Sequence, residues 1–499
     1  MPLLFYTRIY KSDEWKEVRH MKIKKEKRLR LSAYDKKKFF EKFKTGLIIV
    51  LCLLCAVLTY SVTRLSSTDD GLPAFSLSSV GLGAESSEFT SENALTTFSG
   101  LSEPELILIG RDNVRYILGA ENPGYAKTVE AVNRVINSLH SSDTVYTRLE
   151  NTAETKRLLS AAQFYVKYPC ERSVSFDAQF NGIKDSPMLK NLAVYSQMFI
   201  AAQSTGSITA YIPDTDGKIV KAECVAASSA FGEVLGDIAN FTGTPCSFAY
   251  EFSGDAERQF RTALSPMLVI PKAPLAAAAI KCGVPWNFAH GLNLIRNTEF
   301  SNELLNIFNF NPNTIRQYTD KNGALVFVGD GGTLSVSPDG IIDYKALAAA
   351  DSAKSGSTDI YTPTAEFMSI TDKVFRLCDI NLSAADFSLK FTAVPAMSID
   401  NSDVFLGLDY YVDGNKVETA DGYAIDAEIS GGTVTRLKIC VRNIEKTDTH
   451  TESGAFADAV DAFCNENPKT VIITGGSLVY DARNADGTEK NASWKIMGE

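Results

Sequence analysis

The sequence predicts an α+β protein with a single-pass N-terminal transmembrane helix and a multidomain extracytoplasmic region. Three observations support this fold class: an uncharged run at residues 45–63, a reversal of charge across that run, and a long remainder that combines amphipathic helices with short alternating strands. The extracytoplasmic region is expected to begin with an α+β domain. Two related domains rich in β-meanders are expected to follow it.

Residues 45–63 contain no charged side chain. At 1.5 Å per residue, a helix of this length just crosses a hydrocarbon core of about 30 Å. Residues 1–44 carry 15 Lys and Arg against 6 Asp and Glu, a net charge of +9; because the whole chain carries −10, the remainder carries −19. Since positive flanks stay cytoplasmic, we expect a cytoplasmic tail at residues 1–44 and an extracellular C-terminal region at the cell membrane.

Three alternatives concern this N-terminal region. A basic tail can bind nucleic acid, but attraction to an anionic inner leaflet already explains its lysines, and we expect no nucleic-acid partner. A cleaved signal peptide would end in a small-x-small site, which residues 58–62 lack, so we expect an uncleaved anchor. We also hypothesise that translation begins at Met21, because Lys16-Glu17-Val18 is what a ribosome-binding sequence would encode, so that residues 1–20 are a mis-annotated start.

One face of the expected transmembrane helix is lined by small residues. Cys52, Cys55, Ala56, Thr59 and Thr63 fall at i, i+3, i+4, i+7 and i+11. Small residues allow helices to approach closely in lipid, and hydroxyl groups add hydrogen bonds between helices. This stripe is therefore the candidate surface for packing on a partner helix. The alternative is an anchor surrounded by lipid, in which Cys and Thr simply replace apolar residues.

The region beyond the anchor divides into a stalk and three domains. Residues 64–102 are rich in Ser, Thr and Gly and are expected to form a flexible stalk. The first domain, residues 103–244, contains an amphipathic helix near 126–139 and a hairpin at 207–222 that turns at Asp216-Gly217. The second, residues 245–350, is β-rich with a helix at 301–308 capped by Ser301. The third, residues 358–499, is also expected to be rich in β-meanders and includes a helix at 453–465.

The second and third domains share a similar spacing of glycines, which suggests an internal repeat. The glycines at 323, 332 and 340 are 9 and 8 residues apart, and those at 414, 422 and 432 are 8 and 10 apart. Aligning Tyr318-Thr319-Asp320 with Tyr411-Val412-Asp413 gives two meanders with glycine turns. The alternative is a chance resemblance, because meanders converge easily.

No motif of catalysis or metal binding stands out in the sequence. His140, His290 and His450 have no partner at metal-ligand spacing. His140 lies at the end of the first long helix, where it is expected either at the surface or as a partner of the helix dipole at the C-terminus. We expect no catalytic, cofactor-binding or metal site, no cofactor, and no enzymatic activity. Seven cysteines outside the anchor lack a Cys-x-x-Cys pair, so we expect small core residues, with a Cys224–Cys246 disulfide as the alternative.

Residues 310–323 resemble the segment of YycH-family proteins in which an Asn/Asp-Pro turn precedes Tyr-Thr-Asp-x-Gly. Residues 408–417 and the closing Trp494-Lys495-Ile496 are similar to the YycI-like domain. The resemblance covers most of the chain after Glu103, although the Ser-rich stalk and the outer cysteines are not features of that family.

The resemblance implies a membrane-anchored accessory regulator from Gram-positive bacteria. Such a protein acts on the WalK-type sensor histidine kinase of a two-component system that controls cell-wall metabolism, has no catalytic residues, and has the kinase and a YycI-like protein as partners. One alternative is an anchored extracytoplasmic binding or wall-associated module with no kinase partner. Another is a hydrolase with an unrecognised site.

Overall fold

The computed structural model describes residues 101–499 with gaps at 112–113, 151, 181–182, 184, 204–206, 225–227, 238–240, 252–259, 261, 290–297, 348–359, 395–403 and 421. All of these residues belong to one compact unit, Ser87–Glu499. The expected tail, transmembrane segment and all but the last two residues of the stalk lie outside the described residues. Among the helices that are described, none is long and apolar enough to cross a membrane.

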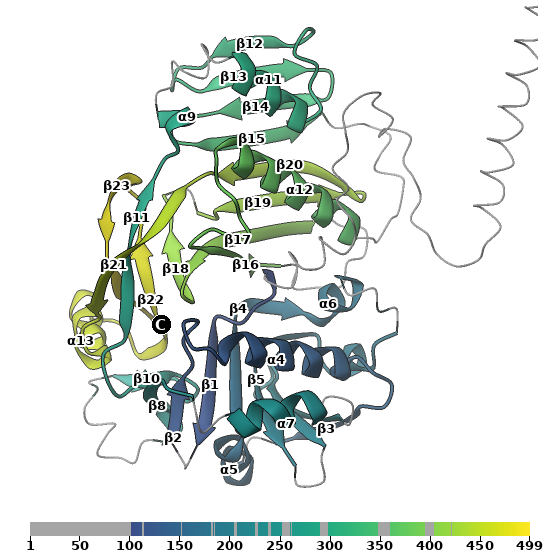
Figure 1. The fold of residues 1–499 in the computed structure, drawn as a ribbon. Coiled ribbons are helices and arrows are strands. Elements are labelled where there is room, and N and C mark those ends of the chain that lie inside the picture. The colour runs from purple at the N-terminus through teal and green to yellow at the C-terminus, as the bar shows by residue number, and fades with distance from the viewer. Residues whose placement is uncertain are drawn as a thin grey trace, which may run out of the picture. The chain divides into compact units, whose positions relative to one another are not determined.

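The first sheet is antiparallel throughout and follows the predicted α+β pattern (Figure 1). Its strands run in the order β10 (Val269–Pro271), β8 (Thr244–Phe248), β2 (Val114–Ile117), β1 (Leu106–Arg111), β4 (Phe164–Ser173), β5 (Val194–Ala202), β6 (Ile208–Pro213), β7 (Ile219–Cys224) and β3 (Val145–Leu149). The predicted Asp216-Gly217 turn joins β6 to β7, and Gly217 has a φ of 74°, which glycine adopts without strain.

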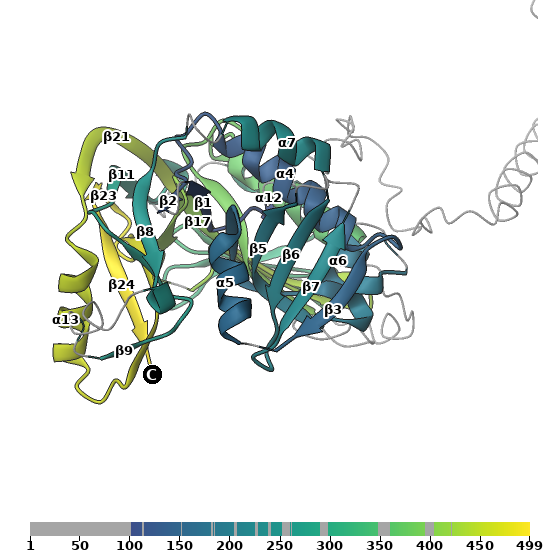
Figure 2. The same ribbon diagram turned by 90° about the horizontal axis from the view of Figure 1, so that it is seen from below.

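Helices cover both faces of the first sheet. One face packs against α4 (Tyr125–Leu139) and α7 (Ser228–Asp237), and the other packs against α5 (Ala153–Ala161) (Figure 2). α4 is amphipathic because its apolar residues recur at helical spacing, and its fully buried members are Val132, Val135 and Leu139. The short helices α6 (Val174–Phe180), η2 (Pro187–Lys190) and η4 (Ala249–Glu251) lie in the connections. We call this sheet with α4 to α7 the first lobe.

The predicted domain boundary at residue 244 does not coincide with the end of the first sheet. β8 pairs with β2 through Arg115 and Cys246, and β10 pairs with β8 through Ile270 and Ser247. The sheet therefore continues to Pro271. The predicted boundary lies too early in the sequence because β8 and β10 are short strands. Their place in the sheet is decided by pairing with distant residues.

The second sheet contains the same arrangement of one helix and four strands twice. The first repeat comprises α11 (Thr298–Ile307), β12 (Arg316–Thr319), β13 (Leu325–Gly329), β14 (Gly332–Val336) and β15 (Ile341–Ala346). The second repeat comprises α12 (Tyr361–Leu377), β16 (Ser388–Ala393), β17 (Val404–Val412), β19 (Ile425–Ser430) and β20 (Thr433–Cys440). β15 pairs antiparallel with β20, so the last strands of the two repeats join them into one sheet.

The helix ends show that the two repeats are equivalent. Asn309 and Asp379, 70 positions apart, are both left-handed, with φ of 59° and 62°. Each follows a helix whose end is closed by the same backbone bond, from Phe310 N–H to Leu305 O (2.8 Å) and from Ile380 N–H to Phe375 O (2.9 Å).

After each helix, an asparagine side chain accepts a backbone N–H two residues on. Asn311 accepts from Asn313 at 3.0 Å, and Asn381 accepts from Ser383 at 3.2 Å. The helix, its left-handed end and the following turn are thus built twice. The residues 310–323 that carry the sequence resemblance begin at the end of α11 and run to the turn after β12.

The sequence alignment of the two meanders is wrong by one strand. It matched the turn before Gly323 with the turn at Asp413-Gly414. In the structure the first turn joins β12 to β13, which corresponds to the connection from β16 to β17, whereas Asp413-Gly414 joins β17 to the extra strand β18 (Asn415–Glu418). Both turns need positive φ, so similar residues recur at places that are not equivalent.

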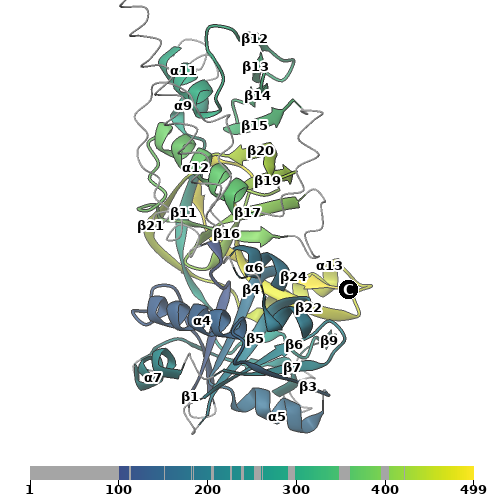
Figure 3. The same ribbon diagram turned by 90° about the vertical axis from the view of Figure 1, so that its right-hand side faces the viewer.

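Helices α11 and α12 lie along the same face of the second sheet (Figure 3). The buried cluster between helices and strands includes Phe300, Leu304, Phe367, Phe375, Leu334, Ile342, Leu437 and Ile439. The predicted N-cap at Ser301 is wrong, because α11 already begins at Thr298 and Ser301 is buried within it. We call the second sheet with α11 and α12 the second lobe.

The remaining strands connect the two lobes. β11 (Ala276–Gly283) pairs with β21 (Asn443–Glu452) and β23 (Asp486–Lys490) in a small sheet. The second sheet also continues from β18 to β22 (Ile472–Asp481) and β24 (Ala492–Gly498), and β9 (Ala263–Leu264) pairs with β22. α13 (Phe456–Glu466) packs on β24, and the short helix α9 (Trp286–Ala289) follows β11.

All seven cysteines of the described residues are free, and five of them are buried, which confirms their prediction as small core residues. The alternative disulfide between Cys224 and Cys246 does not form. Five strands separate β7 from β8, at about 4.8 Å for each step, whereas a disulfide needs Cα atoms closer than about 7 Å.

The pairing of Ile342 with Ile439 offers a test of the joint between the repeats. Both side chains are fully buried and lie directly opposite across β15 and β20. We predict that Ile342→Ala and Ile439→Ala each lower the free energy of unfolding by about 2–5 kcal/mol, and that the double variant departs from additivity by at least about 0.5 kcal/mol. Chemical denaturation of the full chain measures both, with the exposed Val471→Ala as control. Additive losses would contradict a shared core at the joint.

Candidate functional site

Residues 101–105, where the described chain begins, lie between the two lobes. Leu101 is only 3% exposed and belongs to the buried cluster of the second lobe, together with Phe176 of the first lobe. The backbone N–H of Glu105 donates to Lys167 O at 2.8 Å and so continues the pairing of β1 with β4. We call residues 101–105 the stalk junction, because the expected stalk leads into it.

Lys390 of β16 holds the stalk junction from the second lobe. Its side chain is 2% exposed, and its Nζ donates to Pro104 O at 2.8 Å and lies 3.6 Å from a carboxylate oxygen of Glu103. The Nζ also lies 5.5 Å from the centre of the Tyr411 ring. Burial lowers the pKa of Lys390, and the negative charge of Glu103 opposes this shift.

Arg172 of β4 holds the stalk junction from the first lobe. Its guanidinium donates to Ser102 Oγ at 3.3 Å and forms a buried ion pair with Asp177, whose Oδ2 lies 3.2 Å from Arg172 Nε. Tyr195 completes the group by donating its hydroxyl to Asp177 at 2.6 Å. A buried ion pair of this kind persists only when its remaining polar atoms are also hydrogen-bonded, which fixes the geometry of Arg172.

The outer edge of β16 is covered by the first lobe. Cys170 Sγ donates to the carbonyl oxygen of Phe391 at 3.6 Å, and the rings of Phe176 and Phe391 meet edge to face at 5.7 Å. Two elements of the first lobe, β4 and α6, therefore cover the side of β16 that does not pair with β17.

A cleft opens beside the stalk junction and is the candidate binding site. Its volume is about 110 Å³, and segments from both lobes line it. The lining residues are Glu105, Leu106, Ile117, Leu118, Gly119, Ala120, Tyr125, Lys167, Val269, Pro271, Leu275, Asp413, Gly414, Asn415, Gly476, Ser477, Leu478 and Trp494.

The turn between β17 and β18 brings the second lobe to the cleft. Asp413 and Gly414 both have positive φ, 49° and 82°, as a two-residue hairpin turn requires. A Cβ atom at Gly414 would lie 3.7 Å from the carbonyl oxygen of Glu105, so the turn approaches the stalk junction closely. The two ion pairs of the lining are Glu105 with Lys167 at 3.6 Å and Asp413 with Lys446 at 3.2 Å.

The chemistry of the cleft suits an apolar group presented by a polypeptide. The cleft, at about 110 Å³, is smaller than the cavity of about 150 Å³ that holds a benzene ring, so it has room for no more than one small apolar side chain. Its walls include Leu106, Leu478 and Trp494, while its carboxylates are already paired with lysines. Clefts at the junction of two lobes are frequent binding sites.

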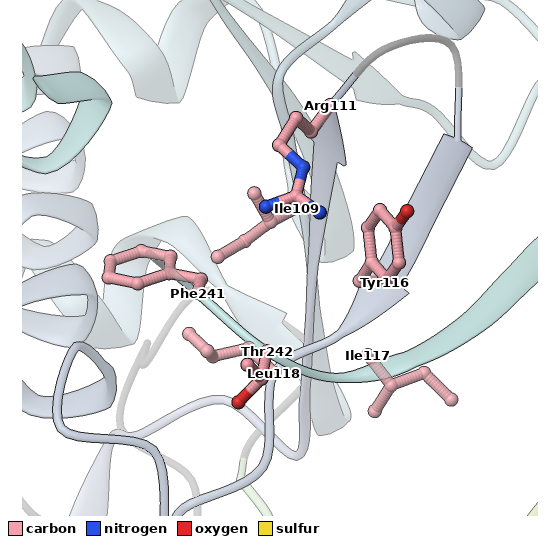
Figure 4. Close-up of a pocket in the computed structure, with 7 residues that line it drawn as sticks. All are labelled: Ile109, Arg111, Tyr116, Ile117, Leu118, Phe241 and Thr242. Atoms are coloured by element: carbon pink, nitrogen blue, oxygen red, sulfur yellow. The ribbon is translucent and has the colours of Figure 1, made fainter. Parts of the chain in front are cut away.

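A second, smaller cavity lies on the hairpin of β1 and β2 (Figure 4). It measures about 10 Å³, enough for one water molecule, and is lined by Ile109, Arg111, Tyr116, Ile117, Leu118, Phe241 and Thr242. The guanidinium of Arg111 lies 5.0 Å from the ring centre of Tyr116. This cavity is too small to bind a ligand.

His140 is buried rather than exposed, which corrects the expected surface position. It caps the C-terminus of α4 as predicted, but only 4% of it is exposed, and its Nδ1 lies 2.7 Å from Ser186 Oγ. Burial lowers the pKa of His140, and the negative charge of Asp177 opposes this shift.

The predicted partner-helix stripe, Cys52, Cys55, Ala56, Thr59 and Thr63, lies outside the described residues. Within the described ranges, no group of three or more His, Cys, Asp and Glu side chains is placed to hold a metal ion. Sequence reasoning missed both the stalk junction and the cleft. Lys390 gave no distinct signal for the junction, because it lies in a strand that alternates between polar and apolar residues. The cleft gave no signal either, because its lining comes from distant segments.

No family model matches the chain, and no curated protein matches it. Among solved structures, the chain is similar to the crystal structure of YycH from Bacillus subtilis. The sequence identity is 12%, the TM-score is 0.47, and the match covers 80% of this chain and 96% of that one. YycH is the family that the sequence resembles, but a likeness at this TM-score supports no statement about activity or partners.

The buried His140 predicts a loss of stability in acid. Because its folded pKa lies below 6.5, the unfolded chain binds a proton more readily, and stability falls as the pH drops from about 6.5 through the folded pKa. We expect a loss of up to about 1.4 kcal/mol for each pH unit in that window, measured as the free energy of unfolding. His140→Asn should remove this dependence, whereas His450→Asn, at an exposed position of β21, should not. Equal pH slopes in all three proteins would contradict the assignment.

Proposed function

We propose that this chain is a membrane-anchored, non-enzymatic accessory regulator of a sensor histidine kinase, in a two-component system that controls cell-wall metabolism. It acts through its transmembrane helix and its extracytoplasmic lobes, with a YycI-like protein as a further partner. The uncharged run at residues 45–63, the reversal of charge across it, and the resemblance of residues 310–323 to the YycH family support this proposal.

The position of the stalk junction carries the proposal. The chain that leaves the expected anchor enters the fold between the two lobes, where Arg172 and Lys390 hold it from either side. Glu105, the last residue of the junction, also lines the cleft. A partner that fills the cleft therefore contacts both lobes and also Glu105, at the end of the stalk junction.

The tether lets two weak contacts reinforce each other. Leu101 and Ser102, the last two residues of the expected stalk, are held in the stalk junction, so the predicted stalk is limited to residues 64–100. A flexible chain of that length would have a root-mean-square end-to-end distance of roughly 35 Å. Once the transmembrane helix pairs with a kinase helix, this stalk keeps the lobes at a high effective concentration beside the kinase. Such a regulator shifts the kinase only by the difference in its affinity for the two kinase states.

The cleft also supports a second function, that of an anchored extracytoplasmic or wall-associated binding module with no kinase partner. In that case the helix would serve only as an anchor, and its small residues would face lipid. The two functions differ in whether the sequence of the helix matters.

Exchange of the helix surface separates these two functions. We predict that replacing Cys52, Cys55, Ala56, Thr59 and Thr63 with Leu changes the kinase-dependent phosphorylation of the response regulator by about threefold or more. The larger side chains prevent close approach of the helices, and each lost hydrogen bond between helices costs about 0.6–2 kcal/mol. The matched control replaces Leu47, Leu51, Leu54 and Leu58 with Ile and should leave phosphorylation unchanged. Unchanged phosphorylation in both, at normal expression, would favour the binding module.

Lys390→Met tests the stalk junction itself. Methionine keeps the apolar stem but removes the ammonium that bonds Pro104 O, so a buried carbonyl loses its partner. We predict that the amide hydrogens of residues 101–103 and of Glu105 exchange about tenfold faster; Pro104 has no amide hydrogen. Lys345→Met, at a half-exposed lysine on β15, is the control. Unchanged exchange at residues 101–105 would show that Lys390 does not hold the junction.

A further inference from the structure

The two repeats leave their first strands in different surroundings. β12 and β16 are equivalent, and each is the outermost strand of its repeat, with β13 or β17 as its partner. The outer edge of β16 is covered by β4 and α6 of the first lobe. In contrast, all four residues of β12 are exposed, and Tyr318 is 54% exposed. Among the described residues, the outer edge of β16 is therefore covered, and the equivalent edge of β12 is exposed.

The side chains agree with this difference. On β16, Leu389 and Phe391 lie opposite the buried Tyr410 and Leu408 and are themselves buried. On β12 the corresponding positions are Gln317 and Thr319, opposite the buried Phe327 and Leu325. Directly opposite residues share one face of a sheet. The covered strand β16 is thus apolar at these positions. The exposed strand β12 is polar, as a strand that contacts water whenever no partner is bound requires.

The backbone of β12 offers hydrogen-bonding groups to a further strand. Asp320 N–H donates to Ala324 O at 2.8 Å at the end of the hairpin. Because hydrogen-bonded and non-hydrogen-bonded pairs alternate along an antiparallel ladder, Tyr318 directs its backbone groups toward β13. Gln317 and Thr319 direct theirs outward, away from the sheet. An edge with such groups is a template for strand addition.

We propose that the outer edge of β12 binds an extended segment of a partner protein, which adds to the second sheet as a further strand. This inference rests on the proposed function, and it assigns the segment to the extracytoplasmic part of the sensor kinase. Backbone bonds to Gln317 and Thr319 supply the affinity, and Tyr318 packs on a side chain of the added strand.

The size of the edge fits a transient partner rather than a second copy of the chain. Four residues cannot bury the roughly 800 Å² on each side that a stable dimer needs. A short strand contact is weak by itself and becomes effective when a membrane tether holds the partner nearby. Within the chain, β16 is covered by side-chain contacts from β4 and α6 and not by a further strand, so the equivalent edge is protected there by a different kind of contact.

The test uses the full chain and, as probe, the purified full-length cognate sensor kinase, both embedded in the same lipid vesicles so that each keeps its membrane anchor. Thr319→Pro removes the outward N–H, which an edge strand tolerates because that group takes no part in the ladder. We expect Thr319→Pro to weaken binding about tenfold or more. The matched control Thr319→Ala keeps the N–H and should bind within about twofold of the unaltered chain.

Hydrogen exchange of the unaltered chain gives a readout that does not depend on any variant folding. The amides of Gln317 and Thr319 should exchange about tenfold more slowly when the probe is bound. Binding by the unaltered chain without this protection, and with equal affinity for Thr319→Pro, would overturn the strand site and leave the proposed function standing. No binding by the unaltered chain would overturn both. Protection that grows with the concentration of the chain alone would identify a second copy as the occupant and overturn the assignment to the kinase.

Discussion

The antiparallel pairing of β15 with β20 is the interaction on which the rest of the second lobe depends. It joins two repeats into one sheet with a continuous apolar face, and α11 and α12 cover that face together. The joint also places β12 and β16 at opposite ends of the two repeats. The first lobe covers β16, whereas β12 is exposed. The two repeats therefore share one internal arrangement, but their outermost strands have different surroundings.

Local patterns in the sequence predicted elements whose structure is decided locally. The periodicity of α4 and the Asp216-Gly217 hairpin are examples, because each follows from residues near in the chain. α12 was missed. Thr364 and Thr371 interrupt its apolar face, yet both are buried, since their hydroxyls donate to the carbonyls of Ile360 and Phe367 one turn earlier. β21 was missed because its polar residues become a strand only by pairing with β11.

The candidate site was less predictable than the fold, because distant segments build it. Lys390 looks in sequence like an ordinary outward-facing residue of an alternating strand, and only the covering of β16 by the first lobe makes it a buried contact. The cleft has the same origin, since a two-residue turn at Asp413 meets Glu105. The helix stripe at residues 52–63 stays a prediction, as it lies outside the described residues.

The buried thiols have a consequence for how the chain reaches its folded state. Burial raises the pKa of Cys246 and of Cys378 to about 12, so at pH 7 only roughly one in 10⁵ of these groups is the reactive thiolate. In an open chain the thiolate fraction is about a thousandfold larger. Oxidants therefore discriminate between folded and unfolded molecules, and chains that fold slowly are exposed for longer to the formation of wrong disulfides. How well the cysteines are protected from oxidation therefore depends on the folding rate as well as on their burial in the folded structure.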